Sequence, residues 1–547
     1  MISLETATRL GLLSGNLINS RSNLRRQGFD EDNWEHKSMR LFKPALLAAA
    51  AIMAAAPAFA QKSQDTLRLA VISPFAALST YDLPHEEAAV FSREIYDFLL
   101  VYDEHNKKYV PSLAKSWKRI DDKTLEFELR DDVKFHNGNK FDANDVKATL
   151  DYLLDPKSKI TYQGRYNWVK ELEILSPYKI RVHAVEPTAT DLNTLAYRFQ
   201  MWDAETLNGM ADKGDYSRLA VMGTGVYKMV SFDRNKGVLV ERNEAYNVNP
   251  IKKAGVKRVQ GVFIPDRETQ AAQLITGGID WIRGATPDTA KALAENPNIK
   301  VSYVASPTFV YIALDSQNLS GNKALSDPRV RKAIHKAIDR ETIIKYLVPG
   351  GDVAEHVQGL CFKATIDCDY QVQAEKYDLE GAKKLMAEAG YANGFDMQYD
   401  VFAPAKAIGE AIAGDLRKIG VRAAMNVVDL SLYRRKQGDG KLEAWSILFP
   451  TGSYPDIGNI FSVFFTGPAF KYYDDPIISE AMVKGEAEFD PAKRAQIYGK
   501  ALNRINEMNY ILPISSVPVL HVHTKDAKIA PNVFSAGETY AADFQWN

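Results

Sequence analysis

The segment from residue 378 to residue 428 constrains the fold more than any other, because two different periodicities follow each other there. Asp378 is a residue type that caps helices, and Gly390 can take the left-handed conformation at which a helix stops. Apolar residues recur at helical spacing between them, at Ala382, Leu385, Met386 and Ala389. The pattern therefore predicts a helix that begins after residue 378 and ends before residue 390.

A strand, a second helix and another strand are predicted directly after this helix. Residues 395–401 alternate between apolar and polar, as in a half-buried strand. Pro404 then opens a helix that ends at Gly420, and the apolar residues 421–428 follow. The apolar positions of that helix are Ile408, Ile412, Leu416 and Ile419. This β-α-β order predicts an α/β fold with a parallel or mixed sheet in the C-terminal half.

Segments earlier in the chain have a different pattern of apolar and polar residues. Residues 125–129 and 180–184 alternate like half-exposed strands, and short polar turns separate them from their neighbours. We expect an α+β subdomain there. The chain has no internal repeat or low-complexity linker after residue 60, which favours compact domains made from interleaved segments.

Length, charge and cysteine content narrow the class of protein. A chain of 547 residues is expected to form two or three domains. Its 68 Lys and Arg balance 69 Asp and Glu, which argues against nucleic acid as a partner. The two cysteines, Cys361 and Cys368, are too few for a cysteine-built zinc site. They form a disulfide in an oxidising compartment, or else they are two free thiols.

Residues 39–60 have the parts of a secretory signal peptide. Basic residues precede an apolar run at 45–56, and the small residues Ala58 and Ala60 follow it. The run is shorter than the roughly 20 residues of a membrane-spanning helix. We expect cleavage before Gln61 and export to the periplasm of a chain that is not inserted in the membrane.

Residues 1–38 are polar and lack helical or strand periodicity. With these residues present, the signal peptide would lie inside the chain, whereas a signal peptide works at the N-terminus. Met39 is therefore the expected first residue of the natural protein. We interpret residues 1–38 as a non-native or mis-assigned extension without function.

Motifs for catalysis and for metal binding are incomplete. The sequence HEEAA at 85–89 has alanine where a zinc protease needs its second histidine. The sequence GTGVYK at 223–228 lacks the third glycine of a dinucleotide loop and the ending of a phosphate loop, so a tight turn explains it better. His521 and His523 share one face of a strand and could bind metal, but we interpret them as plain polar residues on an exposed strand. No cofactor and no resident metal are expected.

Several motifs, in order along the chain, carry a resemblance to a known family. They are PSLAKSW at 111–117, LRDDVKFHNGNKFDANDV at 129–146, GTGVYK at 223–228, RNEAY at 242–246, GID at 278–280, DPRVRKAI at 327–334 and AIDR at 337–340. This series closely resembles the family 5 extracellular solute-binding proteins, which are periplasmic receptors of ABC importers for peptides, opines, sugars or nickel complexes. The motifs span nearly all of the chain after residue 60.

The resemblance implies a two-lobed periplasmic binding protein fold of type II, with an extra α+β subdomain in the first lobe. The first lobe would comprise 61–104, 223–306 and 517–547, the extra subdomain 105–222, and the second lobe 307–516. Two hinge strands would join the lobes, and ligand would bind in the cleft between them. The partners implied are a peptide or another small polar solute and an inner-membrane permease, and we expect a monomer.

The resemblance also locates part of the ligand site. In peptide-binding relatives an aspartate in a segment similar to DYPDPDN holds the α-ammonium of the peptide, and this chain reads SYPDIGN at 453–459. Ser453 replaces that aspartate and loses a charge-assisted hydrogen bond, so an ordinary peptide amine would be held poorly. Asp456 could take over the role, or it could cap a loop or helix. A polar non-peptide ligand is therefore a competing hypothesis.

Aromatic side chains are further candidate contacts in the implied cleft. They are Tyr81, Trp202, Trp281, Tyr433, Trp445 and Tyr454, of which Tyr81 and Tyr454 are favoured because they follow strand ends. Two alternatives to an import receptor stay open. One is a periplasmic hydrolase or peptide-processing enzyme, for which no assembled nucleophile, base or metal motif is found; the other is a receptor that presents its ligand to a sensor or acts as a chaperone.

Overall fold

The structure is a computed structural model that describes residues 65–81, 86–103, 105–158, 160, 163–249, 252–362, 365–368, 372–449, 456–529 and 539–547. The predicted signal peptide and the extension before it lie outside these residues. Pro57–Asn547 form one compact unit, which holds all of them. Within the described ranges, no helix is both long enough and apolar enough to cross a membrane.

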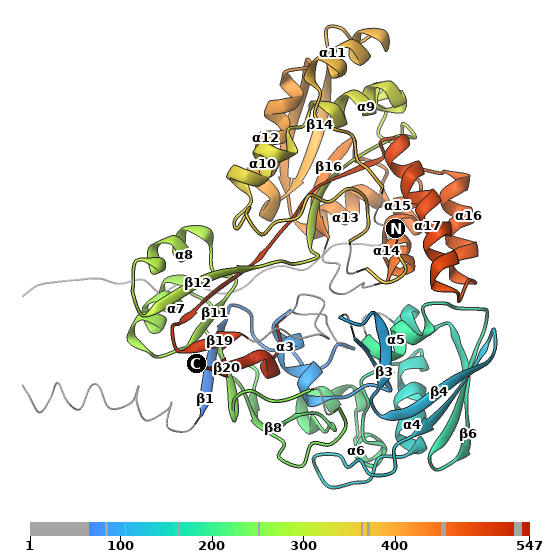
Figure 1. Ribbon diagram of the computed structural model, residues 1–547, viewed down its shortest axis with the longest axis vertical. Helices are drawn as coiled ribbons and strands as arrows, with labels where there is room; N and C mark the ends of the chain where they lie inside the picture. The colour runs from blue at the N-terminus through green and yellow to red at the C-terminus, as the bar shows by residue number, and fades with distance from the viewer. Residues whose placement is uncertain are drawn as a thin grey trace, which may run out of the picture. The chain divides into compact units, whose positions relative to one another are not determined.

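A mixed seven-stranded sheet has the order β12-β18-β11-β1-β10-β9-β8. Figure 1 labels β1, β8, β11 and β12 of this sheet. Its strands are β1 (Thr66–Val71), β8 (Tyr227–Asp233), β9 (Gly237–Arg242), β10 (Arg258–Phe263), β11 (Trp281–Arg283), β12 (Ile299–Val304) and β18 (Val519–Thr524). Along the chain, helix α3 (Glu86–Ile95) follows β1, α7 (Arg267–Thr276) lies between β10 and β11, and α8 (Pro287–Ala294) lies between β11 and β12. The central strand β1 pairs in parallel with β10 and β11, and its six residues are all buried. The sheet thus joins strands that are far apart in the sequence.

A buried ion pair connects β1 with the start of β11. Asp280 accepts hydrogen bonds from Nε and Nη2 of Arg68 at 2.9 and 3.0 Å and from the backbone N–H of Arg68 at 2.9 Å. Breaking such a pair costs about 3–5 kcal/mol, because one charge stays buried without a partner. The motif at 278–280 therefore has a structural role.

A four-stranded antiparallel sheet forms the α+β region expected in the first half of the chain. Its order is β4 (Ala114–Asp121), β5 (Thr124–Leu129), β7 (Lys179–Ala184) and β6 (Val169–Ser176). The strands predicted at 125–129 and 180–184 are confirmed. Helix α4 (Ala143–Leu154) begins at Asp142, whose side chain accepts from the Asn144 N–H in a capping box. The remaining elements of this region are β2 (Leu100–Asp103), β3 (Lys108–Pro111), α5 (Asp191–Tyr197) and α6 (Ala204–Gly209).

The predicted β-α-β unit lies in a second mixed sheet, of order β15-β14-β16-β13-β17. Its strands are β13 (Phe309–Leu314), β14 (Phe395–Phe402), β15 (Val421–Val428), β16 (Ala444–Phe449) and β17 (Ile511–Ser516). Strand β14 pairs in parallel with β15, as the sequence predicts. Helix α11 (Leu379–Glu388) begins at its cap Asp378, and Gly390 has a φ of 87°. One detail is wrong: Pro404 lies in a 3₁₀ turn, and α12 (Lys406–Arg417) begins two residues later.

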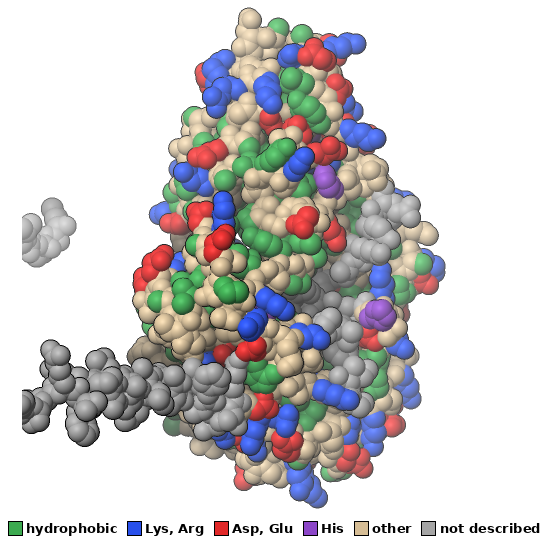
Figure 2. Space-filling model, turned by 60° about the vertical axis from the view of Figure 1, so that its left-hand side comes forward, with side chains coloured by type: hydrophobic (Ala, Val, Ile, Leu, Met, Phe, Trp, Pro, Cys, Tyr) green, Lys and Arg blue, Asp and Glu red, His purple; other side chains and the backbone are tan. Residues whose placement is uncertain are grey.

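Further helices accompany the second sheet (Figure 1). They are α9 (Pro328–Ala337), α10 (Arg340–Leu347), α13 (Leu430–Gly438), α14 (Ile457–Phe464), α15 (Gly467–Phe470), α16 (Pro476–Glu486) and α17 (Pro491–Glu507). A short pair, β19 (Ala527–Ile529) and β20 (Phe544–Trp546), closes the described chain. The exact lobe boundaries stay a prediction. On the face that Figure 2 presents, Lys and Arg are mixed with Asp and Glu, as the balanced composition suggests.

Candidate functional site

Two short segments carry the chain from one large sheet to the other. Residues 305–308 connect β12 to β13, and residues 517–518 connect β17 to β18. The two segments are hydrogen-bonded to each other, because Val517 N–H donates to the Thr308 carbonyl at 2.7 Å. Pro307 and Pro518 lie in them, and proline has no N–H to donate. These crossing segments are the candidate hinge of the site.

Arg494 on α17 is the centre of a buried polar network in the second half of the chain. Its Nη1 and Nη2 donate to the two carboxylate oxygens of Asp456 at 2.7 and 2.8 Å. Nη1 also donates to Asp367 at 2.9 Å, and Nε donates to the Gly485 carbonyl at 2.9 Å. A bidentate Arg–carboxylate pair fixes both distance and orientation. The network therefore holds three separate chain segments together.

Asp456 serves as the cap of helix α14. Its Oδ1 accepts from the Gly458 N–H at 2.7 Å, in addition to the bonds from Arg494. The side chain of Asp456 is 2% exposed. A Cβ at Gly458 would lie 2.6 Å from Nη2 of Arg494, so a larger residue there would displace the guanidinium. The helix-cap interpretation of Asp456 is thus the arrangement found, and the charge of its carboxylate is already paired with Arg494.

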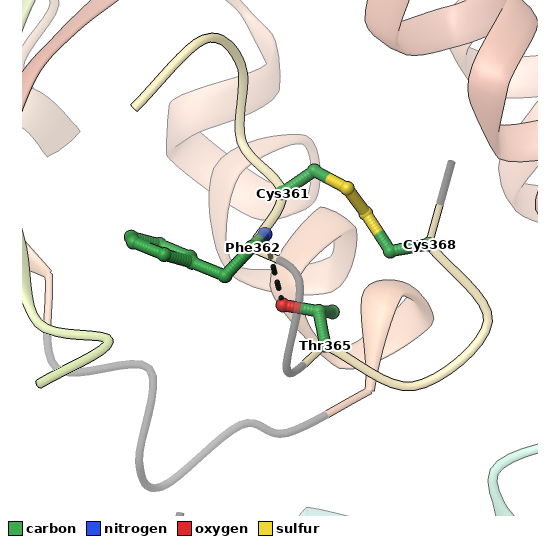
Figure 3. Close-up of a disulfide and its surroundings, with 4 residues drawn as sticks. All are labelled: Cys361, Phe362, Thr365 and Cys368. Carbon is green, nitrogen blue, oxygen red and sulfur yellow. Dashed lines mark hydrogen bonds between the residues drawn. A yellow bond between two sulfur atoms is a disulfide. The ribbon is translucent and has the colours of Figure 1, made fainter. Parts of the chain in front are cut away.

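Asp367 lies in a loop that Cys361 and Cys368 close with a disulfide (Figure 3). The two Cα atoms are 6.1 Å apart. Inside the loop, Thr365 Oγ1 accepts from the Phe362 N–H at 3.2 Å, and the Ile366 carbonyl accepts from the Ile457 N–H at 3.2 Å. The loop therefore borders the first turn of α14.

Burial changes the pKa of two groups around Arg494. It raises the pKa of Asp367, although the neighbouring guanidinium of Arg494 opposes this shift. It also raises the pKa of Tyr109 on β3 well above its usual value, and the charge of Asp456 adds to that shift. The phenol of Tyr109, which is protonated at neutral pH in any case, is held further from ionisation.

The network offers charge and hydrogen bonds rather than a reactive group. Arg494 and the two carboxylates are paired with each other, and no described serine or cysteine is aligned with a base there. Within the described ranges, no group of three or more His, Cys, Asp or Glu side chains is placed to hold a metal ion. The arrangement suits binding and positioning.

The aromatic candidates of the first half of the chain pack in a core cluster. The rings of Tyr81 and Trp202 are 5.1 Å apart, and Trp202 stacks on Tyr216 at 4.4 Å. Tyr81 donates from its hydroxyl to the Gln200 carbonyl at 2.5 Å. Both Tyr81 and Trp202 are almost fully buried. Contact of either ring with ligand stays a prediction.

Of the other candidates named here, the structure describes Tyr433 and Trp445. Tyr433 and Trp445 are buried in a separate core cluster, where Trp445 packs edge-on against Tyr472 at 5.0 Å. Ser453 and Tyr454 lie outside the described residues. The structure therefore brings Tyr81 together with Trp202, and Tyr433 together with Trp445, within their own clusters.

The interpretation of an exposed strand at His521 and His523 is wrong. Strand β18 lies inside the sheet between β12 and β11, so both histidines are buried. His521 stacks on Trp281 with ring centroids 5.3 Å apart, and burial lowers the pKa of His521 to about 3. These rings belong to the core of the first sheet.

Three polar residues of this region were not found from sequence: Arg494, Asp367 and Glu486. Arg494 is a charged residue among the buried positions of α17, and this pattern is a usable signal for a buried ion pair. Asp367 lies between the two cysteines, so the cysteine pair marked its loop. Glu486 gives no local signal, because its partner Thr190 is 296 residues away.

The comparisons with known proteins agree with this architecture. The model of the bacterial extracellular solute-binding proteins, family 5, matches residues 108–472, more than half of the chain. The glutathione-binding protein GsiB of Pectobacterium atrosepticum is 25% identical over 473 residues, which cover 83% of this chain and 88% of the relative. The nickel-binding periplasmic protein of Escherichia coli is 25% identical over 464 residues, covering 78% and 84%.

A solved structure shows the same fold. The ABC transporter-associated periplasmic binding protein DppA of Helicobacter pylori, in complex with the peptide STSA, superposes with a TM-score of 0.69 at 23% identity. The match covers 89% of this chain and 99% of that one. The predicted two-lobed α/β fold class is confirmed.

Replacing both cysteines, Cys361→Ser with Cys368→Ser, should lower the free energy of unfolding by about 2.5 kcal/mol, the chain-entropy value for a loop of this length. Urea unfolding of the wild type and the double variant measures the difference. Dithiothreitol should destabilise the wild type and leave the double variant unchanged. Labelling of both thiols in the unreduced, unfolded wild type would contradict the disulfide.

Proposed function

The chain belongs to family 5 of the bacterial extracellular solute-binding proteins, and from this premise we propose that it captures a small polar solute between two lobes. It hands this solute, a peptide or a non-peptide compound, to the permease of an ABC importer in the inner membrane. The protein acts as a monomer in this proposal. The observation that carries the proposal is the family match, which extends from the four-stranded sheet to the helices around Asp456.

The relatives support a binding function and leave the ligand open. The names of the relatives refer to glutathione and nickel, and the solved relative holds a peptide. These ligands differ in charge and size, so similarity to these relatives does not indicate which ligand this chain binds. The family is one of binding proteins, and the alternative of a hydrolase receives no support.

The polar network supports a ligand that is not held by an ordinary peptide amine. Ser453 is neutral, and both oxygens of Asp456 already accept from Arg494. A ligand ammonium would thus find no carboxylate with an unpaired charge at either position. We propose Ser453 and Tyr454 as ligand contacts. Tyr81, Trp202, Tyr433 and Trp445 stay proposed contacts that need a ring to turn out of its core cluster.

The ligand is identified by denaturing protein purified from its native periplasm and measuring the released small molecules by mass spectrometry. Each candidate is then added back in a thermal-shift assay, where a true ligand raises the melting temperature by mass action. We expect a non-peptide or blocked-amine compound. A peptide with a free amine that raises the melting temperature would contradict the proposed role of Ser453.

The substitution Ser453→Asp tests the same role in the opposite direction. It should improve the affinity for peptides with a free N-terminus by about tenfold, because it restores a charge-assisted hydrogen bond. The matched control is Ser453→Asn, which adds similar volume without charge. Equal peptide affinities in the two variants would show that position 453 does not face the amine.

We propose that export removes everything before Gln61. The relatives that are named periplasmic support this location, and the predicted signal at 39–60 supports the cleavage site. The protein recovered from the periplasm should have the intact mass of residues 61–547. A mass that retains residues 39–60 would contradict cleavage at this site.

A further inference from the structure

Residues of the four-stranded-sheet region form direct hydrogen bonds with helices of the second sheet. Glu486, the last residue of α16, accepts at Oε1 from Thr190 Oγ1 at 2.6 Å and from the Thr190 N–H at 3.4 Å. Its backbone carbonyl accepts from the Ala189 N–H at 2.7 Å. Asn459 Nδ2 donates to Asn193 Oδ1 at 2.9 Å. We call these five residues, Ala189, Thr190, Asn193, Asn459 and Glu486, the latch.

An aromatic contact lies beside the latch. The guanidinium carbon of Arg119 is 3.8 Å from the centroid of the Phe489 ring. Arg119 is held in place by Asp191, whose oxygens accept from its Nη2 at 2.8 and 3.0 Å. A guanidinium over an aromatic face adds attraction of the cation–π type. The same two regions are thus joined by three independent kinds of contact.

The carboxylate of Glu486 depends on the latch for its hydrogen bonds. A carboxylate at the C-terminal end of a helix is repelled by the helix dipole. Burial also raises the pKa of Glu486. Among the described residues, only Thr190 donates hydrogen bonds to its carboxylate. The Ala189 N–H meanwhile satisfies a backbone carbonyl that a helix end leaves without an intrahelical partner.

We propose that the latch favours the closed conformation before any ligand binds, and that Glu486 and Thr190 set the affinity for all ligands without selecting among them. This rests on the proposed closing of two lobes around a solute. The apparent dissociation constant equals the intrinsic one divided by the closed fraction. A weaker latch would therefore raise the dissociation constant of chemically different ligands by one common factor. Substitution of a residue that contacts the ligand would instead change the ratio between the dissociation constants of different ligands.

Hydrogen exchange of the ligand-free protein tests the latch. The Ala189 and Thr190 amides should be protected in the wild type and exchange about tenfold faster in Glu486→Ala and in Thr190→Val, which removes the hydroxyl at nearly constant volume. Amides of β4 and β5 should exchange as in the wild type. The effects of the two substitutions should be less than additive in the double variant, because they remove one shared interaction.

Glu480→Ala is the matched control, because Glu480 lies on the same helix and pairs only with Lys484 among the described residues. It should leave the Ala189 and Thr190 amides unchanged. Unaltered exchange in Glu486→Ala, or an equal acceleration in Glu480→Ala, would overturn the proposal. Since this experiment contains no ligand, its failure is distinct from a failure to recover a solute from the periplasm.

Discussion

The crossing segments at 305–308 and 517–518 are the constraint on which the rest of the structure depends. Each continues a strand of one sheet into a strand of the other, so β12 and β18 pair in the first sheet while β13 and β17 pair in the second. The pairing is antiparallel on both sides, and the Val517–Thr308 hydrogen bond links the two crossings. Neither sheet can be completed unless the chain crosses twice. Rotation at the crossings leaves the strand pairing of both sheets intact.

The second half of the chain holds buried charges that are paired with each other. The desolvation cost of burying Arg494 is offset by the hydrogen bonds that Asp456, Asp367 and the Gly485 carbonyl accept from it. The disulfide loop places Asp367, and the cap at Asp456 places α14. The first turn of α14, next to the segment that carries Ser453, is therefore held rigidly. In the proposed binding function, a wall that is fixed in this way would reduce the entropy that is lost when a ligand binds.

The elements with local causes could be predicted from the sequence. The cap at Asp378, the stop at Gly390 and the alternation at 395–401 act within a few residues, and the structure has each of them. Pro404 shows the limit of such signals, since a proline at a helix start is equally suited to a 3₁₀ turn before it. His521 looked exposed because strand pairing on both sides of β18 is not visible in its own segment. Arg494 and Asp367 meet across 127 residues, a contact that no local pattern encodes.

We propose that this protein closes two lobes around a solute at the crossing segments. Small-angle X-ray scattering of the purified protein, measured without ligand and then saturated with the solute released from the native protein, tests it most directly. We expect a smaller radius of gyration in the saturated sample, because contacts shared by both lobes favour the closed conformation. An unchanged scattering curve at saturation, with binding verified in the same sample, would contradict it.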